Sequence, residues 1–109
     1  MEKDKITVKT QGKINMIVIS DITHITCDGY VSTIHTICEN NTKVSKLLKE
    51  FENELAECGF IRVNHCTLVN FKHITAIKLN KIRTLLLTNN TNIVISRRKW
   101  RFVAEFMKK

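Results

Sequence analysis

Residues 22–37 read ITHITCDGYVSTIHTI, and this stretch decides the fold class. Its two halves, residues 22–27 and 31–37, are rich in β-branched side chains, which favour strands. Between them, Asp28-Gly29 is a dipeptide typical of the tight turn of a β-hairpin. The stretch therefore predicts two antiparallel strands with a loop tip at residues 28–32.

Strand patterns continue on both sides of this hairpin. Upstream, apolar residues at spacing two run from Ile6 to Val8 and from Ile14 to Val18, and Gln11-Gly12 predicts the turn between them. Downstream, strand-like stretches lie at residues 60–63, 74–79, 82–88 and 92–95, with turns at residues 80–81 and 89–91. No internal repeat or linker is visible, so residues 1–109 are expected to form a single domain.

Two helices are expected among these strands. Apolar residues at helical spacing between residues 44 and 58 predict one amphipathic helix, with Ser45 as its N-cap and Gly59 as its stop. Its charged outer face is assigned to solvation and intrahelical pairing. After Ser96, the residues Trp100, Val103 and Phe106 predict a short closing helix. The expected fold class is mainly β, with a minor α content.

The positive charge of the chain lies almost entirely in its second half. Residues 1–54 contain seven Lys or Arg against eight Asp or Glu, whereas residues 55–109 contain eleven against two. Such an asymmetry is typical of a surface that binds a polyanion, because neutralising phosphates releases counterions. Charge that serves only solubility is the alternative.

The composition also bounds the compartment. No stretch approaches the roughly 20 apolar residues that a membrane span needs, and no signal-peptide run follows the N-terminus. We therefore expect a soluble, cytoplasmic protein. The four cysteines, Cys27, Cys38, Cys58 and Cys66, are expected to be free thiols, since there is no export signal and the chain can fold without disulfides.

The strongest conflict with local rules lies at Ser96-Arg97-Arg98-Lys99. If Ser96 caps the last helix, three cations occupy its first turn, where the helix dipole disfavours positive charge. A bound phosphate would remove the conflict, because exposed N–H groups and cationic side chains both favour an anion. A solvated basic turn is the alternative.

Metal and catalytic sites receive little support. His24-x-x-Cys27 and His35-x-x-Cys38 have ligand-like spacing, but residues three apart on a strand point to opposite faces. No glycine-rich phosphate loop is present, and His65 and Cys66 are adjacent strand residues that face apart. We expect no metal, no cofactor and no enzymatic activity.

The order of several motifs resembles the LytTR family of DNA-binding domains, which are output domains of bacterial response regulators. The motifs are Phe60-x-Arg62, Leu68-Val69-Asn70, His73-Ile74 and Val94-Ile95-Ser96-Arg97-Arg98, with the hairpin at residues 22–37 and the helix after Ser45 upstream. The resemblance covers nearly the whole chain. It implies an elongated stack of small antiparallel sheets with one amphipathic helix and a short C-terminal helix.

The resemblance also implies that loops enter successive major grooves on one face of bent DNA. The contacts carried over by position are Ser32, Thr33, Asn64, His65, Lys72, Arg97, Arg98 and Lys99. Arg98 matches best, and a bidentate arginine on guanine is the commonest direct readout. Arg97, Lys99 and Lys72 would contact phosphates. Asn64-His65-Cys66 departs from the family pattern, so base preference there is expected to differ. Asn70 is expected to cap the turn at residues 71–73.

The expected function is sequence-specific binding of double-stranded DNA by a transcription regulator. A basic protein-interaction module of the same fold is the alternative, and an enzyme is the third choice. The family usually has a receiver domain in a sensor-kinase pathway, and the sequence leaves open a standalone regulator or part of a longer one. We expect a free monomer, because no spare exposed apolar run is evident, and two copies on promoter direct repeats.

Overall fold

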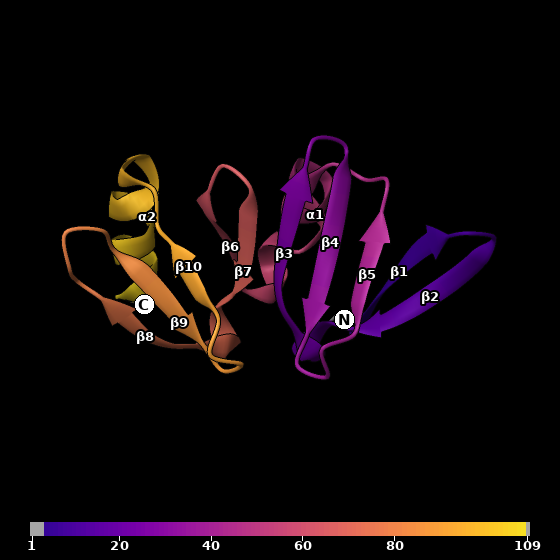
Figure 1. Ribbon diagram of the computed structural model, residues 1–109, viewed down its shortest axis with the longest axis horizontal. Coiled ribbons are helices and arrows are strands. Elements are labelled where there is room, and N and C mark those ends of the chain that lie inside the picture. The colour runs from indigo at the N-terminus through magenta and orange to yellow at the C-terminus, as the bar shows by residue number, and fades with distance from the viewer. Residues whose placement is uncertain (1–3, 109) are drawn as a thin grey trace.

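The computed structural model describes residues 4–108 as an elongated, mainly β molecule with extents of 44 × 32 × 24 Å (Figure 1). Ten strands lie within these residues: β1 (Lys5–Thr10), β2 (Lys13–Val18), β3 (Ile22–Asp28), β4 (Val31–Thr36), β5 (Asn41–Val44), β6 (Phe60–Asn64), β7 (Thr67–Asn70), β8 (Ile74–Lys78), β9 (Thr84–Leu87) and β10 (Asn92–Val94). The helices are α1 (Leu48–Glu54) and α2 (Arg97–Met107), with 3-10 turns η1 (Ile19–Asp21), η2 (Ala56–Cys58) and η3 (Phe71–His73).

Three antiparallel sheets follow one another along the long axis (Figure 1). The hairpin β1-β2 lies at one end, the five-stranded sheet β5-β4-β3-β7-β6 lies in the middle, and β10-β9-β8 lies at the other end beside α2. This arrangement confirms the expected fold class. The hairpin predicted from residues 22–37 is present as β3 and β4, and Gly29 in its turn has φ +64°, a conformation that suits glycine.

Two hydrophobic clusters lie on opposite faces of the central sheet. The first joins β3 and β4 to α1 and the β1-β2 hairpin, and it includes Ile25, Ile34 and Phe51, all fully buried. The second joins β6 and β7 to the third sheet and α2, and it includes Val69, Leu85 and Val103. Because alternate residues of a strand point to opposite faces, Leu68 belongs to the first cluster and its neighbour Val69 to the second. The central sheet therefore contributes side chains to both hydrophobic clusters and so joins the two halves of the molecule.

The sequence analysis missed two strands of this sheet. All four residues of β7 are buried, since the strand lies between β3 and β6 and has core on both faces, so it lacks the alternation of a half-exposed strand. The other missed strand, β5, is a short edge strand that ends at Val44. The helical spacing of Val44 from Leu47 and Leu48 predicts instead that Val44 belongs to the helix.

The predicted limits of the first helix were also wrong. The α1 helix begins at Leu48, and the Glu50 carboxylate, rather than Ser45, accepts a hydrogen bond at its start, from the N–H of Leu47 at 3.0 Å. The α1 helix ends at Glu54, and Gly59 ends the following η2 turn instead, in the left-handed conformation with φ +85°. The closing helix α2 is present as predicted, with 11 residues against seven in α1.

Two polar side chains hold the connection between the central sheet and the third sheet. Asn70 is buried and caps η3 as predicted: its Oδ1 accepts from the Lys72 N–H at 3.1 Å, and its Nδ2 donates to Ile22 O at 3.0 Å. The Nε2 of His73 donates to Ser20 O at 2.6 Å, and its Nδ1 is 2.9 Å from Thr88 Oγ1. These bonds fasten η3 to β3, to η1 and to the residue that follows β9.

The expectation that no apolar run remains exposed was wrong. On β2, Ile14 is 68% exposed, Met16 is 64% exposed, and Val18 is also exposed on the same face. Lys5 and Lys9 of β1 are the cross-strand partners of Val18 and Ile14. The outer face of this hairpin is therefore an apolar row with lysines along one side, at the end of the molecule farthest from α2 (Figure 1).

Neither helix in the described part of the chain has the length and apolar character that crossing a membrane requires.

Candidate nucleic-acid interface

Three projections lie along one long edge of the molecule. The β3-β4 turn, the β6-β7 turn and the first residues of α2 all reach the upper edge in Figure 1. We call this edge the tip edge. It brings Tyr30, His65 and Arg98, which are far apart in sequence, to one side of the protein.

The first turn of α2 is the most basic of these projections. Ser96 caps the helix as predicted, because its Oγ accepts from the Lys99 N–H at 3.2 Å. Arg97 and Arg98 are exposed, and no acidic side chain lies in this turn. Lys99 is half-buried, with its Nζ 5.7 Å from the centre of the Phe102 ring. Three cations thus surround the positive end of the helix dipole, as an anion site requires.

The β6-β7 turn faces this helix start and is held by its own side chains. Asn64 Nδ2 donates to Val94 O at 2.7 Å, and Asn64 Oδ1 accepts from the Cys66 N–H at 2.9 Å. Arg62 donates to His65 O at 2.6 Å and pairs with Glu52 at 3.0 Å. The backbone of the turn is therefore fixed, while the His65 side chain is left exposed.

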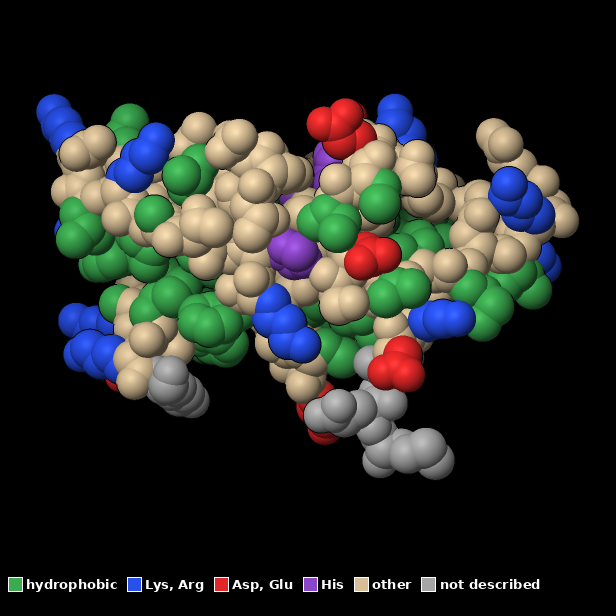
Figure 2. Space-filling view, turned by 90° about the horizontal axis from the view of Figure 1, so that it is seen from below, with side chains coloured by type: hydrophobic (Ala, Val, Ile, Leu, Met, Phe, Trp, Pro, Cys, Tyr) green, Lys and Arg blue, Asp and Glu red, His purple; other side chains and the backbone are tan. Residues whose placement is uncertain are grey.

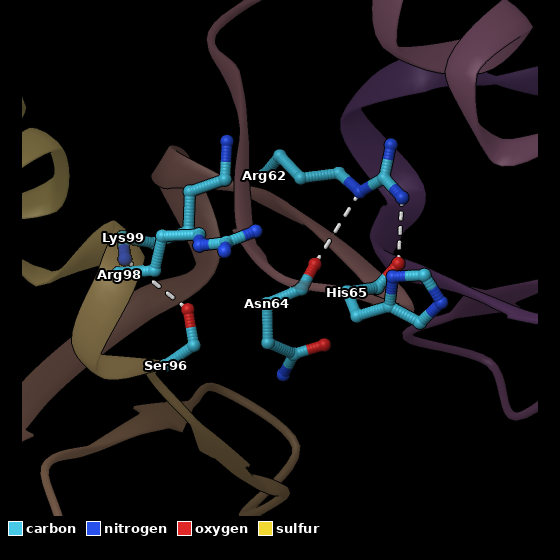
Figure 3. A pocket seen from close by; sticks show the side chains of 6 residues that line it. All are labelled: Arg62, Asn64, His65, Ser96, Arg98 and Lys99. Carbon is cyan, nitrogen blue, oxygen red and sulfur yellow. Dashed lines mark hydrogen bonds between the residues drawn. The ribbon is translucent and has the colours of Figure 1, made fainter.

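A cleft of about 390 Å³ separates the turn from α2 (Figure 3). Its lining consists of Arg62, Asn64, His65, Ser96, Arg98 and Lys99. The Arg98 side chain extends from α2 toward the turn, whereas the Arg62 guanidinium is turned toward the His65 backbone (Figure 3). Glu52 pairs with Arg62, and no acidic side chain is among the lining residues, so the cationic groups of Arg98 and Lys99 give this cleft a net attraction for an anion.

The structure brings five of the eight predicted contact residues together, and these are Asn64, His65, Arg97, Arg98 and Lys99. Asn64, however, uses its amide to hold the turn and Val94, so it positions the site. Thr33 is half-buried on β4, opposite Thr26 and Lys43, two residues below the exposed turn.

Two predicted contacts lie elsewhere. Ser32 is fully buried, and its hydroxyl donates to Lys46 O at 2.6 Å, so it ties β4 to the chain before α1. Lys72 is exposed in η3, after the end of β7 that pairs Asn70 with Phe60, whereas His65 lies at the opposite end of that strand. Position along the sequence could not reveal which face or which strand end these side chains occupy.

The opposite long edge is different in character. In the view from below, Lys and Arg side chains stand in small separate groups among hydrophobic and uncharged ones, with acidic side chains near them (Figure 2). On the tip edge, by contrast, the first turn of α2 alone contributes Arg97, Arg98 and Lys99 without an acidic residue.

Tyr30 is a candidate contact residue that the sequence did not single out. It is 79% exposed in the β3-β4 turn, the highest exposure among the large hydrophobic side chains of the described residues. The Asp28-Gly29 dipeptide was the available signal, since Asp28 pairs with Val31 and the two-residue turn between them consists of Gly29 and Tyr30. An exposed aromatic ring at a tip offers both a stacking surface and a hydroxyl group.

The histidines of the two ligand-like pairs contact each other. The rings of His24 and His35 stack with centroids 4.2 Å apart, and Thr23 and Thr26 hydrogen-bond to their ring nitrogens at 2.9 Å. Burial, together with the positive charge that His35 can carry, lowers the pKa of His24 to about 4. Burial also lowers the pKa of His35, although a hydrogen bond with Asn41 opposes it. Among residues 4–108 no three His, Cys, Asp or Glu side chains converge on a metal position.

Comparison with known proteins agrees with this geometry. The model of the LytTr DNA-binding domain family matches residues 12–108. The chain is 26% identical over 92 residues to the sensory transduction protein LytR of Staphylococcus saprophyticus. The aligned segment covers 83% of this chain and 36% of that protein. It thus spans about a third of the length of that relative.

A solved structure extends the match to the fold. The LytTr DNA-binding domain of a methyl-accepting/DNA response regulator from Bacillus cereus superimposes with a TM-score of 0.84 at 21% identity. The superposition covers 97% of this chain and 98% of that one. The family match over nearly the whole chain is decisive, and its matched range contains all three tip-edge projections. This chain belongs to the LytTR family of DNA-binding domains, a family of transcription regulators.

Proposed function

We propose that this domain binds duplex DNA sequence-specifically through its tip edge, as a cytoplasmic bacterial transcription regulator. The observation that carries the proposal is the cleft between α2 and the β6-β7 turn, with Arg98 and Lys99 on one side and the exposed His65 on the other. Arg98 reads a base, most simply guanine through a bidentate pair, while Arg97 and Lys99 contact phosphates. The domain itself performs no chemistry.

The shape of the domain supports contact with more than one groove. Its three tip-edge projections follow one another along the long axis of the molecule, so they can meet the duplex at successive positions (Figure 1). When the tip edge faces the duplex, the β6-β7 turn and α2 enter one groove. The β3-β4 turn, with Tyr30 at its tip, enters the next groove. A modest bend of the duplex toward the protein would let both sets of contacts form, at a cost that depends on the sequence bent.

The wider assembly is part of the same proposal. Two copies bind a direct repeat in a promoter, each as a monomer in the free state. In a full response regulator, a receiver domain under a sensor kinase would control access to the repeat. The support for this is the relation to a sensory transduction protein, of which the chain spans about a third.

The salt dependence of binding tests the proposal. Labelled duplex carrying the cognate repeat and a random duplex of equal length are titrated at 50 to 200 mM salt. We expect tighter binding to the repeat and a log–log salt slope of about −0.9 for each phosphate contact. Absence of binding to any duplex at 50 mM salt would instead favour a protein-interaction module, for which the apolar row on β2 would be the contact surface.

A further inference from the structure

Two cysteines face each other across neighbouring strands beside the proposed DNA contact. The pairing of β3 with β7 runs to Thr26 and Thr67, and the next pair in this register is Cys27 with Cys66. The Cys27 N–H donates to Cys66 O at 3.0 Å, which holds the two residues side by side, while Cys66 itself lies in the turn before β7 and its own N–H donates to Asn64 Oδ1. Cys66 follows directly after His65 in the β6-β7 turn.

The two thiols are close and one is open to solvent. Residues directly opposite in an antiparallel pair point to the same face, with Cβ atoms about 4.5 to 5.5 Å apart. A disulfide needs about 3.5 to 4.5 Å, so a movement of about 1 Å would close the bond. Cys66 is exposed and lies in a turn, where such a movement is easiest, while Cys27 is half-buried against the first core cluster.

We propose that Cys27 and Cys66 form a reversible disulfide when the protein meets hydrogen peroxide. The Cys66 thiolate attacks one peroxide oxygen, which becomes the sulfenic acid of Cys66 as hydroxide leaves and is protonated to water. The Cys27 sulfur then attacks the Cys66 sulfur, and the sulfenic hydroxyl leaves as water by taking up the proton of the Cys27 thiol. In sum, two thiols and one peroxide give one disulfide and two waters.

The surroundings assign these different roles to the two sulfurs. Burial, and next the proximity of Cys66, raise the pKa of Cys27, so this thiol stays protonated until a partner arrives. The guanidinium of Arg62 acts in the opposite direction on Cys27, which also places that cation near the pair. The exposed Cys66 therefore meets the oxidant first, and Cys27 is the resolving thiol.

Closing the bond would disturb the neighbouring turn. Cys66 is held through its N–H by Asn64 Oδ1, and the same Asn64 amide donates to Val94 O. Pulling Cys66 toward β3 strains this hydrogen bond and tilts the turn that presents His65. We expect oxidised protein to bind cognate DNA between about twofold and tenfold more weakly, equivalent to one lost hydrogen bond. This consequence, unlike the disulfide, rests on the proposed DNA binding.

The direct test is the mass of the oxidised chain. The protein is treated with stoichiometric hydrogen peroxide, remaining thiols are alkylated, and the intact mass is measured. We expect a chain lighter by two hydrogen atoms with two alkylated cysteines. Cleavage before Asp28 and after Arg62 and Lys72 separates Cys27 from Cys38 and Cys66 from Cys58, so the crosslinked peptides identify the pair. Dithiothreitol should restore four alkylated thiols.

Variants give the controls. The double variant Cys38→Ser, Cys58→Ser should form the same crosslink, whereas Cys27→Ser should stop at an oxidised Cys66 that carries added oxygen. Should Cys27→Ser fold poorly, Cys66→Ser, at an exposed position, serves as the second block. A crosslink to Cys38 or Cys58, or equal accumulation of oxygen-bearing Cys66 in wild type and Cys27→Ser, would overturn the proposal.

A second readout does not depend on DNA. The bond closes a loop of about 40 residues, so oxidation should raise the thermal midpoint by about 5 °C or more. A crosslinked chain with an unchanged DNA affinity would reject the effect on the turn and leave the disulfide standing. A chain that binds no DNA in either state would reject the proposed function alone.

Discussion

At the scale of single residues, the proposed base reading by Arg98 can be tested directly. It is exposed at the first turn of α2 and reaches into the cleft (Figure 3). We expect Arg98→Ala to weaken binding to the cognate repeat by about 1 to 3 kcal/mol and to reduce discrimination against random DNA. Competition titration with both duplexes measures each quantity. An unchanged ratio of cognate to random affinity would make Arg98 a phosphate contact.

Lys72 provides the matched control for this experiment. It is a cation of the same C-terminal half, but it lies beyond the far end of β7. We expect Lys72→Ala to leave the salt slope as in the wild type, whereas Lys99→Ala should reduce its magnitude by about one. A slope reduced equally by both substitutions would mean that DNA also contacts the opposite edge.

The stacked histidines predict a pH dependence of stability. The pKa of His24 in the folded protein, about 4, lies below its ordinary value of 6.5. Below pH 6.5 the unfolded chain therefore binds a proton that the folded chain excludes, and stability is lost as pH falls from 6.5 toward 4. His24→Phe should flatten this dependence, although His35 retains part of it in the same direction. Urea denaturation at pH 7.5, 6.0 and 5.0 measures the slope, and equal slopes for both proteins would reject the assignment.

At the scale of elements, the start of α2 combines a helix cap with an anion site, and two substitutions at Ser96 separate these roles. Ser96→Ala removes the acceptor for the Lys99 N–H and should lower the free energy of unfolding by about 1 kcal/mol. Ser96→Asp keeps a capping oxygen and should retain stability, but its carboxylate beside Arg98 should compete with phosphate and abolish tight binding. Chemical denaturation and duplex titration are compared for both variants. Equal binding by wild type and Ser96→Asp would remove this helix start from the interface.

Local rules predicted α2 and its cap because the evidence for them is local. Ser96, the cations after it and the apolar spacing of Trp100, Val103 and Phe106 all lie within 11 residues. The same holds for the Asp28-Gly29 turn and for the cap that Asn70 provides for η3. In each case the stabilising bond joins residues two or three apart.

The errors arose where a distant partner decides the outcome. Both faces of β7 are buried because the first hydrophobic cluster covers one face and the second covers the other, and each cluster draws on segments distant in sequence, such as β1 and α2. Ser32 points inward because β4 packs on the first core cluster, and its hydroxyl meets the carbonyl of Lys46, 14 residues away. The cleft itself joins β6 and α2, which are brought together by bonds such as Ser96 N–H to Val63 O.

At the scale of the whole molecule, the free domain should be a monomer despite the apolar row on β2. Lysines from β1 lie beside this row, and two copies that met face to face would place like charges together. Three exposed side chains also fall short of the apolar centre that a stable dimer needs. Sedimentation at micromolar concentration without DNA should give one monomer peak. A dominant dimer that Met16→Glu dissociates would show that the row is a self-association surface.

The way the β6-β7 turn is held has a consequence for how such domains diversify. Its backbone is fastened by the side chains of Asn64 and Arg62, and these bonds use only the backbone of His65, whose side chain is exposed. New side chains at His65 can therefore be sampled without moving the strands that set the distance between projections. Descendants of one ancestral domain would then share a common operator spacing while diverging in the bases they prefer. Exchanging only this residue between two such paralogues should transfer base preference at one operator position and leave the repeat length unchanged.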